Sequence, residues 1–106
     1  MENSFKDRES QFEAKFAHDE ELKFKVVAHR NKLFAAWVAE QMGAAAAAGY
    51  ADSLVEFAFG RASSELVDKA TRDLESQGVA SADIKVRKAF GHLTDQAEAD
   101  VNSAKA

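Results

Sequence analysis

Proline is missing from all 106 residues of the chain. Proline kinks or ends helices because it lacks an N–H and its ring clashes with the preceding turn, so its absence permits long helices. Good helix formers such as alanine, glutamate, lysine and leucine are common, whereas isoleucine and tyrosine each occur once. The length suits one domain with one modest core. The sequence therefore predicts an all-α protein.

Apolar residues recur at helical spacing in four segments, and short connections between them favour antiparallel neighbours. The first segment begins at Leu22 and ends near Gly43, although the alanine run after it leaves the start of the second helix open. The expected buried residues are Leu22, Val26, Leu33 and Trp37, flanked by Val27, Phe34, Val38 and Met42; Tyr50, Leu54, Val55 and Ala58, with Phe57 or Phe59; Leu66, Val67, Ala70 and Leu74; and Val86, Phe90, Leu93, Ala97 and Val101. This pattern predicts a compact four-helix bundle.

Residues at the ends of these segments suit helix termini. Glycine accepts the left-handed conformation that ends many helices, and Gly60 and Gly78 follow the second and third segments. Serine is favoured at the N-cap of a helix because its hydroxyl oxygen can accept a hydrogen bond from a free backbone N–H. We expect Ser63 or Ser64 to cap the third helix, and Ser81 to cap the fourth.

The N-terminal segment has a different character. Phe5, Phe12 and Phe16 are spaced by seven and four, so on a helix they fall within about 40° of each other, but most of their neighbours are charged. The pairs Asp19–Lys23 and Glu21–Lys25 have the spacing that supports a helix. Burying three rings yields roughly 1.5–3 kcal/mol each, while ordering some twenty residues costs on the order of 1–2 kcal/mol per residue. Two readings stay open: the rings pack on the bundle, or the segment orders on a partner.

Several classes of chemistry find no support in the sequence. There is no cysteine for a disulfide or thiolate site, and His18, His29 and His92 form no metal-binding spacing. No phosphate-binding glycine loop or catalytic motif occurs, so we expect no cofactor, no metal and no enzyme. The net charge of −4 argues against nucleic acid, and no apolar run reaches the ~20 residues of a membrane span. An interaction protein and a small-ligand binder, whose ligand could be a nucleotide, remain.

One stretch carries a family resemblance. The motifs are "DRE" at 7–9, "FEAKFAHDEEL" at 12–22, "FK" at 24–25, "RNKL" at 30–33 and "WVAEQMG" at 37–43. In these the chain resembles the alphaproteobacterial ATPase inhibitor family, the zeta subunit of F-type ATP synthase. The remainder, including "RDLESQGV" at 72–79, fits more loosely, and His29 stands where the family often has arginine.

The resemblance implies a four-helix bundle at 19–103, an inhibitory arm at 1–18 that is mobile or becomes helical on binding, and a frayed tail at 104–106. It implies that the arm enters the catalytic head at an interface of α and β subunits, near the γ rotor, and blocks rotation in the hydrolytic direction. The free protein would be a cytoplasmic monomer that binds at the cytoplasmic face of the inner membrane without inserting into it. The expected partner-binding residues are Phe5, Arg8, Glu9, Phe12, Glu13, Lys15 and Phe16.

Overall fold

The computed structural model describes the backbone of residues 3–43 and 47–103, and the side chains of residues 19–43 and 47–103. This part of the chain holds four α-helices and no strand. The helices are α1 (Asn3–Met42), α3 (Tyr50–Ala58), α4 (Ser63–Ser76) and α5 (Ala82–Asn102). The prediction of an all-α bundle of four helices is confirmed. The predicted tail at 104–106 lies outside the described residues.

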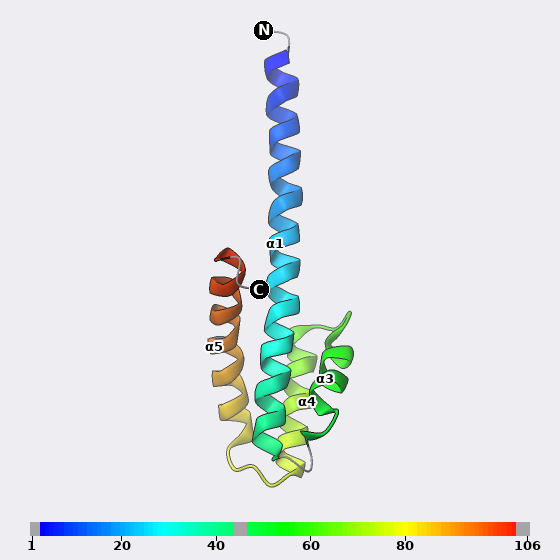
Figure 1. Cartoon of the computed structure of the whole chain (residues 1–106), viewed down its shortest axis with the longest axis vertical. Coiled ribbons are helices and arrows are strands. Elements are labelled where there is room, and N and C mark those ends of the chain that lie inside the picture. The colour runs from blue at the N-terminus through cyan, green and yellow to red at the C-terminus, as the bar shows by residue number, and fades with distance from the viewer. Residues whose placement is uncertain (1–2, 44–46, 104–106) are drawn as a thin grey trace.

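The 40-residue helix α1 is the element that the other three helices share. In Figure 1, α5 lies along one side of the C-terminal half of α1, and α3 and α4 lie along the other side. α4 also packs on α3 and α5, which closes the bundle. The colours show that α1 and α5 run in opposite directions, as do α4 and α5 (Figure 1). The core therefore surrounds the C-terminal half of α1.

The core is built from residues of all four helices. Its largest fully buried side chains are Phe34, Val38, Leu54, Leu66, Leu74 and Val86. The ring of Phe90 meets that of Phe34 edge-on, with 5.2 Å between centroids, a favourable arrangement for two aromatic rings. The predicted buried faces of α3, α4 and α5 are confirmed. Of the two alternatives in α3, Phe57 packs against the core, whereas Phe59 is 83% exposed.

The buried face of α1 is centred one residue later than the sequence predicts. The predicted stripe ran through Leu33 and Trp37, but both are only partly buried, and the fully buried positions are Phe34 and Val38. Val27, predicted to flank the stripe, is 43% exposed. The reason is that helices contact α1 on two sides, so its apolar residues spread over a wide arc. The centre of such an arc does not follow from hydrophobicity alone.

The predicted serine caps differ from the structure. Ala62 is the first cap of α4, and its extended backbone (φ −69°, ψ 151°) lets its carbonyl accept the N–H of Glu65 at 3.0 Å. Ser81 does occupy the first cap of α5, but it makes no capping bond with its side chain. In both helices, therefore, the N-terminal cap is formed by backbone groups and not by a serine hydroxyl.

Gly78 closes α4 as the sequence predicts. Its φ is +80°; the N–H of Gly78 donates to the carbonyl of Glu75 and that of Val79 donates to the carbonyl of Leu74, both at 3.0 Å. These two bonds form a Schellman motif, in which the residue after the cap must be left-handed. A Cβ built at this position would meet no other group within 4 Å. A side chain there is therefore penalised by the left-handed backbone conformation alone and not by a clash.

Gly78→Ala is therefore expected to destabilise the bundle by about 1–2 kcal/mol, the usual cost of a left-handed L-residue. Gly91 offers a matched control: it lies within α5 without a positive φ, and its Cβ position is also open. Gly91→Ala should stabilise by about 0.5–1 kcal/mol, because alanine loses less entropy in a helix. Urea unfolding measures both. Equal signs for the two changes would contradict this account.

The N-terminal part of α1 extends beyond the rest of the bundle. In Figure 1 no other helix lies beside α1 past the C-terminal end of α5, and the molecule measures 67 × 24 × 23 Å. The sequence left open whether the free arm is helical, and its backbone is helical from Asn3. The predicted boundary between residues 18 and 19 thus falls inside one continuous helix, and the division of the chain there stays a prediction.

The bundle should fold without the arm, because every side chain of the described core lies at or after Arg30. A chain lacking residues 1–18 is expected to keep a cooperative urea transition, with a free energy of unfolding within about 1 kcal/mol of the full chain. Circular dichroism measures both transitions. Loss of cooperativity in the shortened chain would show that the arm's rings belong to the core.

Candidate functional site

All seven predicted partner-binding residues lie on the N-terminal part of α1. Their side chains are outside the described part of the chain, so their roles stay predictions. Helix geometry nevertheless fixes the side of α1 on which they begin. Phe16 precedes Phe34 by about five full turns, and Phe12 precedes Arg30 by the same rise. Because α1 is continuous, the backbone positions of Phe12 and Phe16 share the helical phase of Arg30 and Phe34.

The segment where the arm meets the bundle exposes apolar residues among charged ones. Phe24 is 70% exposed and Val27, one turn later, is 43% exposed. The predicted pair Glu21–Lys25 forms at 3.4 Å. Lys23, however, pairs with Glu20 at 3.6 Å, so the predicted Asp19–Lys23 pair is wrong. An i,i+3 partner is as close on a helix surface as an i,i+4 partner.

His29 holds the end of α5 against α1. Its Nε2 lies 2.8 Å from Oδ2 of Asp100, and about a fifth of each side chain is exposed. The other oxygen of that carboxylate accepts the amide N–H of Gln96 at 2.8 Å. Sequence reasoning noted His29 as a histidine without metal-binding spacing and as a departure from the family pattern. Its partner is 71 residues away in the sequence, so no local signal could have identified the contact.

Arg30 is the buried charged residue of the described core, with 9% of its surface exposed. Its guanidinium lies 4.6 Å from the centroid of the Phe90 ring, and its Nη2 donates to Oδ1 of Asn31 at 2.8 Å. Burial lowers the pKa of Arg30, because a low-dielectric surrounding disfavours the charged form. The aromatic face offsets part of that cost by a cation–π contact, so this arginine is a structural residue.

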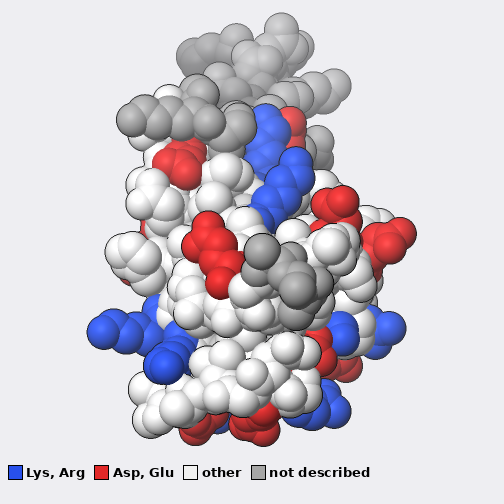
Figure 2. Space-filling view, turned by 60° about the horizontal axis from the view of Figure 1, so that its bottom comes forward, with Lys and Arg blue, Asp and Glu red and all other residues white. Residues whose placement is uncertain are grey.

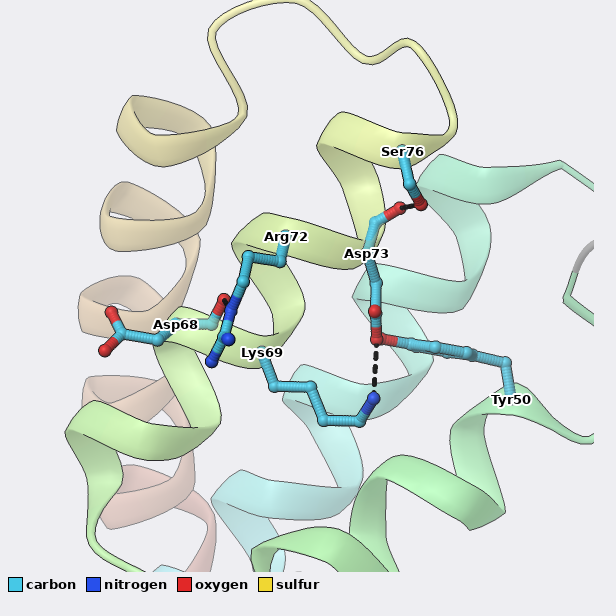
Figure 3. Close-up of polar contacts among 6 residues, drawn as sticks. All are labelled: Tyr50, Asp68, Lys69, Arg72, Asp73 and Ser76. Carbon is cyan, nitrogen blue, oxygen red and sulfur yellow. Dashed lines mark hydrogen bonds and ion pairs between the residues drawn. The ribbon is translucent and has the colours of Figure 1, made fainter.

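A polar cluster joins α3 to α4 (Figure 3). The hydroxyl of Tyr50 donates to Oδ2 of Asp73 at 2.6 Å, and Nζ of Lys69 donates to the same oxygen at 3.0 Å. Burial raises the pKa of Tyr50, and the hydrogen bond to Asp73 and its negative charge add to this effect. Figure 3 also shows Ser76, whose hydroxyl donates to the carbonyl of Asp73 at 2.7 Å. The cluster fastens two helices, and its residues Tyr50, Lys69 and Asp73 also line a surface pocket of about 290 Å³.

The raised pKa of Tyr50 predicts a loss of stability in alkali. The folded state holds the phenol proton more tightly than the unfolded state, whose tyrosine titrates near pH 10. This contribution is complete below about pH 10 and is lost as the pH rises towards the folded pKa. Wild type should therefore lose more free energy of unfolding above about pH 10 than Tyr50→Phe does. Urea unfolding measures this, and Tyr50, the only tyrosine, can be titrated by its absorbance. Parallel losses in the two proteins would contradict the prediction.

The described part of the chain offers no other obvious chemical site. No group of three potential metal ligands occurs among the described residues, and no helix among them is long and apolar enough to cross a membrane. Figure 2 shows acidic and basic side chains scattered around an uncharged area at the end of the bundle opposite the arm. Such a mixed surface is ordinary for a solvated face.

Two surface grooves lie between α1 and α5. One, of about 350 Å³, is lined by Trp37, Gln41, Lys85, Lys88, Ala89, His92 and Leu93. The other, of about 400 Å³, lies at the foot of the arm and is lined by Leu22, Phe24, Lys25, Ala28, His29, Lys32 and Val101. We call the second one the junction groove. Neither was predicted from the sequence, because each is formed by two helices far apart in the chain.

In a comparison with known protein families, the model of the family described as ATPase inhibitor subunit zeta matches residues 1–100. Neither the comparison with curated proteins nor that with solved structures gave a match. The match covers both the projecting part of α1 and nearly all of the bundle, and it ends one residue before Val101 of the junction groove.

Proposed function

The chain belongs to the ATPase inhibitor subunit zeta family, and we propose that it inhibits ATP hydrolysis by the F-type ATP synthase through its N-terminal arm. Membership of an inhibitor family supports a regulatory role that is exerted by binding. The family match covers the arm as well as the bundle, so the proposed effector belongs to the part of the chain that is shared.

The arm would enter the catalytic head between an α and a β subunit, next to the γ rotor, and block rotation in the hydrolytic direction. Phe5, Phe12 and Phe16 would be the apolar anchors, since buried aromatics often carry most of the binding energy at interfaces. The charged residues among them would fix the register and orientation of the helix. They are Arg8, Glu9, Glu13 and Lys15. In this mode a helix lays its apolar edge into a groove of its partner.

The observation that carries the proposal is the length of α1. The helix has 40 residues, but its buried side chains in the described part begin only at Arg30. At the N-terminal end of α1 no other helix lies beside it (Figure 1), and the sequence places Phe5, Phe12 and Phe16 in that part of the chain. An apolar helix edge without a covering helix is what a helix-in-groove inhibitor requires.

The direct test is to titrate the isolated catalytic head, containing α, β and γ subunits, with the purified protein while measuring ATP hydrolysis. A saturable loss of hydrolysis is expected. Unchanged hydrolysis at a large excess of the protein would overturn the proposal.

The alternative function, a small-ligand binder, has one structural feature in its favour. The groove beside Trp37 combines an apolar floor with Lys85, Lys88 and His92, groups that suit an anionic ligand. Purification from a cell lysate separates the two functions. Co-purification of α, β and γ subunits supports inhibition, whereas a retained small molecule without these subunits supports the alternative.

We further propose that the protein acts at the cytoplasmic face of the inner membrane and is a monomer when free.

A further inference from the structure

The junction groove has an apolar floor that includes an exposed aromatic ring. Leu22, Phe24 and Ala28 come from α1, and Val101 comes from the last turn of α5. Phe24 is 70% exposed. Single exposed apolar residues are normal on a protein surface, but Phe24 belongs to a hollow of about 400 Å³ whose other apolar residues come from two helices. The groove is therefore shaped to receive an apolar side chain.

The charged residues that line the junction groove are basic. They are Lys25 and Lys32, with His29 between them. Asp100, next to Val101, is already bonded to His29 and Gln96, and Glu21 pairs with Lys25 at 3.4 Å. Lys32 has no ion pair with any described residue. The ammonium group of Lys32 is therefore available to an acidic partner.

The position of the groove connects it to the arm. Phe24 lies about 12 Å along the helix axis from Phe16. Lys25, Ala28 and Lys32 lie roughly half a turn round α1 from the arm's aromatic edge. A partner that surrounds the arm therefore reaches the groove where the arm leaves it.

We propose that the junction groove binds an acidic segment of the same ATPase, one that carries an apolar side chain and lies at the rim of the opening that the arm enters. This inference rests on the proposed function and adds a second contact to it. The apolar side chain packs on Phe24 between Leu22 and Val101, and the carboxylates pair with Lys25 and Lys32. Because both contacts belong to one chain, the second forms at a high effective concentration once the arm is seated.

The test titrates ATP hydrolysis with wild type, Phe24→Ala and Lys25→Gln/Lys32→Gln. Each variant is expected to inhibit at least about tenfold more weakly, as for the loss of an interface anchor. The deficit of the lysine variant should shrink at high salt, because salt screens exposed charges. The matched controls are Phe59→Ala, whose ring is 83% exposed on another helix end, and Lys85→Gln/Lys88→Gln. Both should inhibit like wild type, and all proteins should unfold alike.

A second measurement identifies the segment. The chain has no cysteine, so Phe24→Cys can carry a single photoactivatable cross-linker, and the product is sequenced by mass spectrometry. A cross-link to an acidic segment of an ATPase subunit supports the proposal. Wild-type potency in Phe24→Ala, or cross-links confined to a second copy of this chain or to its own residues 104–106, overturn it. Failure of wild type to inhibit overturns the proposed function itself, and the same titration shows which of the two has failed.

Discussion

Replacing Phe12 and Phe16 together by alanine is expected to weaken inhibition of ATP hydrolysis at least about thirtyfold. The two residues are one helical turn apart, so both can enter a single groove on the partner. An interface anchor contributes about 2 kcal/mol or more, and such contributions need not add; the loss of one anchor alone corresponds to about thirtyfold. The measurement is a titration of ATPase activity with the variant and with wild type.

The matched control for this change is Lys6→Ala/Ser10→Ala. By helical phase Lys6 and Ser10 lie about 80–160° round α1 from the three phenylalanines, off their edge, so their replacement should leave inhibition nearly unchanged. All three proteins should give the same urea transition, since the core lies elsewhere. Full inhibition by the phenylalanine variant would place the inhibitory surface on the bundle and not on the arm.

Phe34→Ala is expected to destabilise the bundle by about 3–5 kcal/mol, the usual cost of removing a buried aromatic ring. Phe34 is fully buried, and it contacts Phe90 edge-on and stacks beside Trp37 at 6.3 Å between ring centroids. Because domains of this size are stable by only about 5–15 kcal/mol, much of the stability would be lost. The measurement is urea unfolding followed by circular dichroism.

Two further substitutions serve as comparisons for Phe34→Ala. Phe59→Ala removes the same ring from an 83% exposed position and should change the free energy of unfolding by no more than about 0.5 kcal/mol. Trp37→Ala should fall between the two, since Trp37 packs against the core but also lines an open groove. If Phe34→Ala cost less than Trp37→Ala, the buried face of α1 would be the one that the sequence predicts, centred on Leu33 and Trp37.

The helices and most of the buried faces could be predicted because both depend on local spacing. Leu54, Leu66, Leu74 and Val86 are buried as predicted, since each of α3, α4 and α5 has a narrow apolar stripe. α1 differs because neighbours on two sides widen its apolar arc. Its central position, Phe34 instead of Leu33, is decided by where α5 lies, and no pattern within α1 records that.

The residues that sequence reasoning missed depend on partners that are distant in the sequence. Arg30 resembles a surface residue in the charged sequence "HRNK", and its burial becomes possible through the ring of Phe90, sixty positions later. His29 needs Asp100 in the same way. The arm's seven predicted contact residues have the opposite status: their spacing is evident from the sequence, but their proposed partner belongs to another protein.

If the arm enters its target as proposed, the continuity of α1 would set how far the protein can go in. A bare helix with its side chains is about 10–12 Å across, whereas the bundle that surrounds the other end of α1 is about 24 Å wide. An opening just wide enough for the helix would therefore not admit the bundle. The depth of insertion would then be set by the number of residues between the N-terminus of α1 and the bundle, at about 1.5 Å per residue. Adding or removing one turn of helix there would displace every anchoring ring by about 5.4 Å along the helix axis. The length of α1 would therefore set where the rings lie within the target.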